Sequence, residues 1–130
     1  MNCSIKNEAK TVKLWPLISM VCLILVGCGL CGNETDYEEV SPDGKLKAVV
    51  FERDCGATTR ATTQISVLRK SEPLPNEAGN IFIAEGHSLI RMQWRSDTEL
   101  LITYPPGTNV SLRQKQRDRV SIHYDESSTQ

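Results

Sequence analysis

The stretch from Ser41 to Arg53 reads Ser-Pro-Asp-Gly-Lys-Leu-Lys-Ala-Val-Val-Phe-Glu-Arg, and it decides the fold. Its first four residues are typical of a β-turn, with proline at the second position and glycine at the fourth. The residues that follow alternate between two faces. One face carries Leu46, Ala48 and Val50, and the other carries Val49 and Phe51. A turn followed by such a run predicts a β-strand over residues 45–53.

Five further short, β-like runs lie downstream, separated by turn residues, at 62–69, 80–84, 88–95, 98–104 and 119–124, and the first of them is rich in threonine and β-branched residues. In the run at 88–95 the apolar Ile90, Met92 and Trp94 fall on one face. No window shows a helical period. We therefore expect an all-β domain over residues 41–125, a small antiparallel sheet or two-sheet sandwich of about six short strands. Residues 126–130 are expected to form a frayed tail.

The composition is that of a globular chain. The protein has 130 residues, of which 39% are hydrophobic and 24% charged, and its formal net charge is −1. The length favours a single domain. The near-neutral charge argues against a general nucleic-acid binder.

The amino-terminal region differs sharply from the rest. Residues 1–13 are polar and carry three lysines against one glutamate, and residues 14–32 contain no charge. A basic start followed by an apolar run is the layout of a secretory signal. The apolar run is also close to the roughly 20 residues that span a bilayer. Length alone leaves two interpretations, a cleaved signal or a retained anchor helix, and both export the remainder of the chain.

The end of the apolar run resembles the lipobox of bacterial lipoproteins, in the four residues Leu25-Val26-Gly27-Cys28. The resemblance implies that residues 1–27 are a signal peptide, that Cys28 becomes the new amino terminus, and that Cys28 receives a diacylglycerol and a further acyl chain such as palmitate. Two or more chains anchor a protein stably. Gly29 stands where an aspartate would imply retention in the inner membrane, so the resemblance implies delivery to the outer membrane, facing the periplasm.

Processing at Cys28 would change the charge of what remains. The leader holds three of the 15 basic and one of the 16 acidic residues, so residues 28–130 carry 12 basic and 15 acidic residues, a net charge of −3. The first part, residues 28–40, is rich in acidic side chains. We expect it to be a solvated acidic tether.

Two wider resemblances have less content. The motif at 41–45 is similar to the strand opening of a TolB-like propeller blade, but a closed propeller needs at least four blades. At roughly 40 residues per blade the chain is too short for one. Residues 49–59, 64–68 and 79–83 resemble a group of small bacterial envelope proteins, and that resemblance implies no activity.

Once Cys3 and Cys22 are removed with the leader and Cys28 is acylated, the remaining cysteines are Cys31 and Cys55. An exported, oxidising compartment favours a disulfide between them. The sequence leaves open whether they are bonded or whether Cys55 is a buried free thiol, because it gives no Cα separation.

A catalytic role for Cys55 would require one of the two histidines, His87 or His123, within hydrogen-bond reach. His87 stands in a turn and His123 on the polar face of a strand, so we expect neither to serve. The sequence also predicts no metal site and no cofactor, since its histidines and cysteines lack ligand spacing.

A run of alternating basic residues precedes the last strand and consists of Arg113, Lys115, Arg117 and Arg119. One interpretation is a solvated loop or the outer face of a strand. The other is a patch for an anionic partner, such as lipid head groups or a cell-wall polymer.

The sequence therefore predicts a lipid-anchored envelope protein that is a non-enzymatic binding or interaction module, with an unidentified envelope protein or polymer as its partner. Two alternatives remain. One is a single-pass inner-membrane protein with the same exported domain, and the other is a small enzyme that depends on Cys55.

Overall fold

The computed structural model describes residues 30–128, and these form nine strands: β1 (Gly32–Val40), β2 (Leu46–Asp54), β3 (Thr62–Arg69), β4 (Phe82–Glu85), β5 (Arg91–Ser96), β6 (Glu99–Tyr104), β7 (Val110–Arg113), β8 (Gln116–Arg117) and β9 (Val120–Glu126). The expected all-β fold is confirmed. The hydrophobic signal or anchor helix expected at the amino terminus lies outside the described residues.

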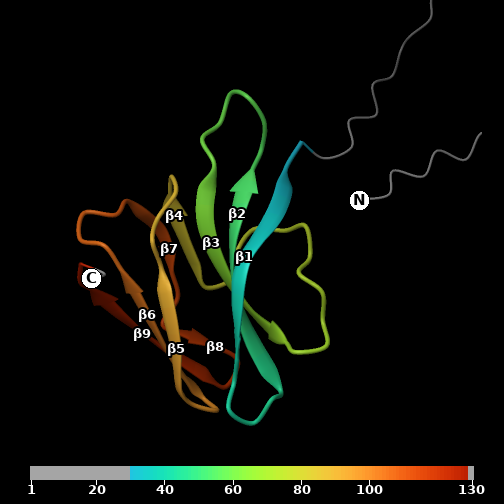
Figure 1. Cartoon of the computed structure of the whole chain (residues 1–130), viewed down its shortest axis with the longest axis vertical. Helices are drawn as coiled ribbons and strands as arrows, with labels where there is room; N and C mark the ends of the chain where they lie inside the picture. The colour runs from blue at the N-terminus through green and yellow to red at the C-terminus, as the bar shows by residue number, and fades with distance from the viewer. Residues whose placement is uncertain (1–29, 129–130) are drawn as a thin grey trace, which may run out of the picture. The chain divides into compact units, whose positions relative to one another are not determined.

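The strands form two sheets that pack face to face (Figure 1). The first sheet has the order β1-β2-β3-β4-β7, and the second has the order β5-β6-β9-β8. All pairs are antiparallel except β6 and β9, which run parallel. The expectation of a purely antiparallel fold is wrong at this pair. Residues 105–119 pass through β7 and β8 between the two strands, and this long crossover lets β9 run in the direction of β6.

All six expected strands are present, and three were not expected. The segment 28–40, expected to be a tether, is strand β1 from Gly32 onward, hydrogen-bonded along β2. A bulge between Thr35 and Tyr37 shifts the register, so that Tyr37 packs against the core. Glu126 is not part of a frayed tail either, because it pairs with Tyr104 at the end of β9.

The core lies between the two sheets. It contains the inward side chains of β2, β3, β5, β6 and β9, together with side chains from the segment around β4. We call these residues the core cluster, which consists of Ala48, Val50, Ile65, Val67, Ile81, Phe82, Ala84, Ile90, Met92, Leu100, Ile102, Tyr104, Val120 and Ile122. Alternation in the sequence predicted the faces of β2, β5 and β9 correctly. Burial of this apolar surface is the main force that holds the sheets together.

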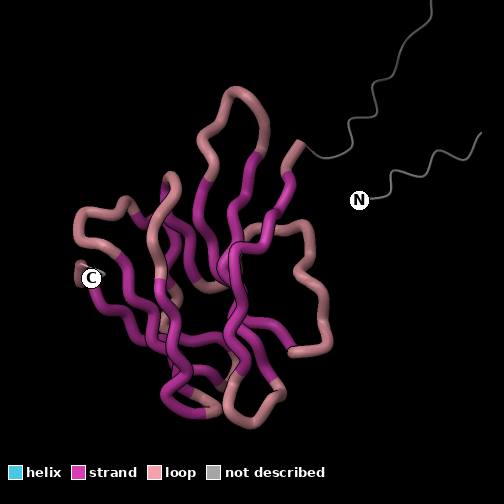
Figure 2. Tube along the Cα trace, in the orientation of Figure 1, coloured by secondary structure: helices cyan, strands magenta, loops and turns pink. Residues whose placement is uncertain are grey.

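A second buried layer lies on the outer face of the first sheet. Val49 and Phe51 are fully buried but do not belong to the core cluster. The loop between β3 and β4 covers this face, seen beside β1 and β2 in Figure 2. The backbone N–H of Gly79 donates to Gln64 Oε1 (2.6 Å), and that of Asn80 donates to Ser66 Oγ (3.1 Å). The loop therefore makes β2 a strand that is buried on both faces.

Strand β1 joins the two sheets along one side of the sandwich. The Tyr37 hydroxyl donates to the carbonyl of Ile90 (2.9 Å) and accepts from the N–H of Met92 (3.1 Å). The Trp94 indole donates to the carbonyl of Glu39 (2.9 Å). The edge strand of the first sheet is thus fixed to the edge strand of the second.

Candidate functional site

Cys31 and Cys55 form a disulfide that joins the start of β1 to the residue after β2. The same end of the first sheet carries further polar contacts to the β3–β4 loop. Asn33 Nδ2 donates to the carbonyls of Pro75 (3.0 Å) and Glu77 (2.8 Å), and Arg53 donates to Asn33 Oδ1 (2.7 Å). We call residues 31–33 and 53–55 the disulfide end of the sheet.

Within residues 30–128, Cys55 is not part of a cysteine-based catalytic group. The sulfur of Cys55 is bonded to Cys31, which leaves no thiolate there. His87 Nδ1 lies 3.3 Å from Glu52 Oε2, and both side chains are largely solvent-exposed. His123 is exposed on β9 in the other sheet.

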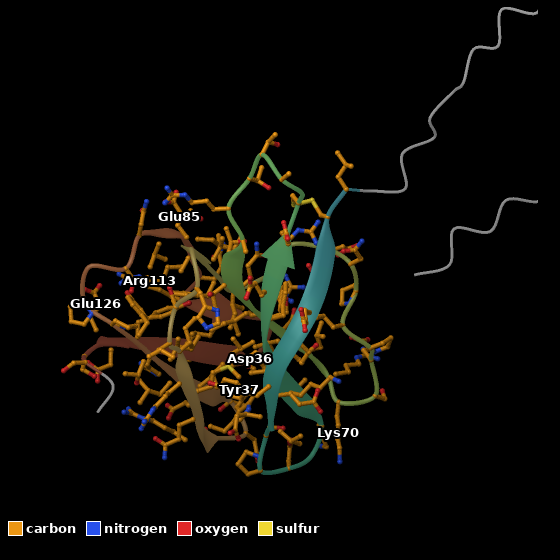
Figure 3. The ribbon with its side chains drawn as sticks, turned by 45° about the horizontal axis from the view of Figure 1, so that its top comes forward. Asp36, Tyr37, Lys70, Glu85, Arg113 and Glu126 are labelled. Carbon is orange, nitrogen blue, oxygen red and sulfur yellow. A yellow bond between two sulfur atoms is a disulfide. The ribbon has the colours of Figure 1, made fainter. Side chains whose placement is uncertain are left out.

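The four basic residues singled out in the sequence do not form one patch. Arg113 is drawn into a cluster on the side of β7 and β9, and Figure 3 shows it beside Glu126 and well apart from Lys70. Its guanidinium donates to the Tyr104 hydroxyl (3.0 Å), lies 3.7 Å from Glu126 Oε1 and lies 5.3 Å from the centre of the Tyr124 ring. Arg113 therefore links β7 to the second sheet and is structural.

Tyr124 is the centre of this cluster. Its hydroxyl lies within hydrogen-bond distance of the carbonyl oxygens of Gln114 (2.6 Å) and Ile81 (3.1 Å). Burial is the main cause that raises the pKa of the Tyr124 phenol above its ordinary value, so the group stays a neutral donor. This side of the sandwich is closed by aromatic packing and hydrogen bonds.

Arg117 and Arg119, in contrast, line a groove of about 580 Å³ between the two sheets. Lys45 and Arg69, at the start of β2 and the end of β3, complete a rim of four cationic side chains. The walls also contain the apolar Leu46, Val67, Leu68 and Val120, together with Glu72, Asn80 and Asp118. We call this set of residues the basic groove. Lys115 is exposed and is not part of it.

The groove exists because two neighbouring strands are short. Strand β4 pairs with β3 only from Thr63 to Ile65. The last residues of β3 pair with β2 but have no neighbouring strand on the β4 side. The side chain of Asn80 takes the place of a strand at Val67, accepting from its N–H and donating to its carbonyl, both at 2.9 Å. Strand β8 has two residues, and it turns into β9 through Asp118, whose φ is 51°. Because β4 and β8 are short, neither sheet covers this part of the space between the two sheets, and the groove lies there.

The three arginines of the rim form only weak ion pairs. The nearest distances from a guanidinium nitrogen to a carboxylate oxygen are 3.9 Å for Arg69 and Glu72, 3.7 Å for Arg117 and Asp118, and 3.5 Å for Arg119 and Asp43. Their guanidinium-bearing side chains remain 80%, 48% and 52% exposed. Exposed pairs of this kind contribute about 0–1 kcal/mol. The three arginines can therefore exchange these partners for a ligand at little cost.

Asp43 is the best-held of the carboxylates near the groove. Its Oδ1 accepts from Ser41 Oγ (2.7 Å) and from the N–H of Lys45 (3.1 Å). These two hydrogen bonds, with smaller contributions from the nearby cations, lower the pKa of the Asp43 carboxyl below its ordinary value. Asp43 stays ionised and positions Arg119 at the rim.

A smaller cavity of about 180 Å³ lies against β1 and β2 and is lined by Glu34, Asp36, Glu52 and His87, among others. Within residues 30–128, no group of three or more histidine, cysteine, aspartate or glutamate side chains is arranged to hold a metal ion. The basic groove is therefore the candidate binding site, in a chain whose formal net charge is −1.

Two members of the groove, Lys45 and Arg69, were not predicted from the sequence. Lys45 follows the turn residue Gly44 and Arg69 lies at the end of β3, 24 positions later, and the pairing of β2 with β3 brings them together. No local pattern carries that information.

Comparison of the chain with models of protein families, with curated proteins and with solved structures finds no match. The lipobox-like residues, Cys28 among them, lie outside the described residues. In the part of the chain from residue 30 to residue 128, no helix has the length and hydropathy needed to cross a bilayer.

Proposed function

We propose that the protein is a lipid-anchored, non-enzymatic binding module of the bacterial cell envelope, held to the membrane at Cys28 and binding an anionic partner in the basic groove. The observation that carries the binding role is the groove itself. It concentrates four cations over an apolar floor in a chain of net charge −1. The lining holds these four cations against the two carboxylates of Glu72 and Asp118, and a cleft with such an excess of positive charge attracts anionic ligands.

The disulfide supports export. Disulfides persist in oxidising compartments such as the periplasm and are rare in the cytosol. The bond between Cys31 and Cys55 therefore agrees with an export signal in the amino-terminal region.

The disulfide and the basic groove lie at opposite ends of β1. Gly32 pairs with Asp54 at the disulfide end, and Val40 pairs with Lys47 beside the groove. The nine residues of β1 separate these ends by about 30 Å. Only two residues lie between Cys28 and Cys31, so acyl chains on Cys28 would tether the domain next to its disulfide end, at the other end of β1 from the groove.

The anchoring half of the proposal is tested by metabolic labelling of the full chain with a palmitate analogue, followed by mass spectrometry and membrane fractionation. We expect acylation, loss of residues 1–27 and recovery in the outer-membrane fraction, with all three lost in Cys28→Ala. The matched control, Cys22→Ala, should be acylated and processed normally. An unacylated chain that keeps its apolar run and stays in the inner membrane would contradict the lipoprotein assignment and support the single-pass alternative.

A further inference from the structure

We propose that the ligand of the basic groove is an extended acidic peptide segment of a partner protein, in which carboxylates alternate with aliphatic side chains. This inference rests on the proposed binding role and adds the chemical class of the partner. Three properties of the groove carry it: its shape, its mixture of charge and apolar surface, and its position in the fold.

The shape favours a chain over a small amphiphile. The groove is open to solvent along one side. A small ligand with an alkyl tail needs a site that covers 70–90% of its surface. An extended peptide is satisfied by a groove that covers one side of it, because successive side chains point to opposite sides and only alternate ones must be buried.

The lining favours a peptide over a highly charged polymer. Leu46, Val67 and Val120 provide apolar floor for aliphatic side chains. The cations Lys45, Arg69, Arg117 and Arg119 surround this floor, and Glu72 and Asp118 interrupt them. A polyanion would gain nothing from the floor and would be repelled by the two carboxylates. A segment that alternates acidic and aliphatic residues matches both surfaces.

The contacts at the rim indicate how a carboxylate would bind. A guanidinium recognises a carboxylate through two parallel hydrogen bonds. Arg69 meets Glu72 at 3.9 Å, and Arg119 meets Asp43 at 3.5 Å, both beyond the length of a short charge-assisted hydrogen bond. Within residues 30–128 no carboxylate forms an ion pair with Lys45. These three cations are available to carboxylates of a ligand.

The position of the groove argues against the protein's own membrane as the anionic surface. The groove lies about one length of β1 from the disulfide end, about 30 Å. The Debye length at physiological ionic strength is about 8 Å, so head groups beneath the tethered end would be screened from these cations. This separation favours a partner other than the head groups next to the anchored end.

Selection from a displayed library of random ten-residue peptides, on the full-length protein in detergent micelles, tests this proposal. We expect enriched peptides that alternate acidic and aliphatic residues, whose affinity falls about tenfold or more for Arg69→Glu/Arg119→Glu. The matched control, Arg60→Glu, changes charge in the exposed loop between β2 and β3, away from the groove, and should leave the affinity unchanged. Higher salt should weaken binding.

Three further probes separate the occupants: vesicles of phosphatidylglycerol, dextran sulfate and a second copy of the protein, read out by sedimentation. The peptide assignment would be overturned if the selection enriched no peptides that alternate acidic and aliphatic residues. It would also be overturned if the enriched peptides bound Arg69→Glu/Arg119→Glu as tightly as they bind the unchanged protein. Dextran sulfate or vesicle binding that the double reversal abolishes, without peptide binding, would overturn the peptide while retaining an anion-binding module. Self-association abolished by the same reversal would place the acidic β1 of another copy in the groove and would also overturn it. Loss of acylation with peptide binding intact would contradict only the anchor.

Discussion

The two ends of the first sheet are built by different chemistry. At the disulfide end, β1 and β2 are joined by a covalent bond, and side-chain amides bind the carbonyls of the β3–β4 loop. At the groove end, the arginines of the rim make exposed ion pairs of 3.5–3.9 Å around the basic groove. A covalent bond between strands stabilises the fold, whereas exposed ion pairs contribute little and are easily exchanged. The comparison assigns stability to one end and binding to the other.

Removing the disulfide should have the largest effect on this comparison. A bond that closes 24 residues of sequence separation stabilises the native state by about 3 kcal/mol on the chain-entropy model. We expect Cys31→Ser/Cys55→Ser to lower the free energy of unfolding in urea by about that amount. The matched change at the groove end, Arg69→Ala/Arg119→Ala, should cost no more than about 1 kcal/mol. Equal losses at the two ends would show that the groove is also a structural element.

A close approach of the backbone at Gly79 should give the next largest effect. A Cβ added there would lie 2.9 Å from the carbonyl oxygens of Ile65 and Phe82. Neither backbone atom can move without shifting a strand, so we expect Gly79→Ala to destabilise by about 1–3 kcal/mol. Gly32→Ala is the control, because no atom lies within 4 Å of its added Cβ. Thermal unfolding of the two variants checks this, and an unchanged midpoint for Gly79→Ala would mean that the loop does not hold the outer face as described.

Asn80 is the one polar side chain of the groove that we expect to be structural. Its amide replaces a missing strand at Val67, with two hydrogen bonds of 2.9 Å. Asn80→Ala should leave both backbone groups of Val67 without these partners and cost about 1–2 kcal/mol in urea unfolding. The exposed Asn109→Ala, whose side chain makes no hydrogen bond within residues 30–128, should be neutral. A neutral Asn80→Ala would show that water satisfies Val67 equally well.

The sequence predicts the core better than it predicts either end. Regular alternation predicted the inward faces of β5 and β9, because each buries about one side chain in two. In β2 it also separated the core-facing Ala48 and Val50 from Val49 and Phe51, although both faces of this strand are buried. Strand β1 has no such signal. Its bulge changes the inward face partway along, and Tyr37 is its one hydrophobic side chain packed against the core cluster. The groove was only half predicted, since Arg117 and Arg119 are local in sequence whereas Lys45 and Arg69 join them through pairing of β2 with β3.

Asp43 should give the smallest effect, as a pH dependence at the groove end. Hydrogen bonds from Ser41 and from the backbone of Lys45 lower the pKa of its carboxyl below the ordinary value of 3.8. A pKa that is lower in the folded state contributes stability above about pH 4, and that contribution is lost as the pH falls through the folded pKa. We therefore expect Asp43→Asn to reduce the difference in urea midpoint between pH 7 and pH 3. An unchanged difference would show that other carboxylates account for the acid sensitivity.

The most direct test of the division between the two ends is to map a bound acidic-aliphatic peptide by the changes it causes in backbone amide NMR shifts. The account predicts changes at Lys45, Leu68, Arg69 and Arg119, and none at Asn33 and Asp54 at the disulfide end. Changes centred on the disulfide end, or a bound peptide that leaves the groove amides unchanged, would contradict it.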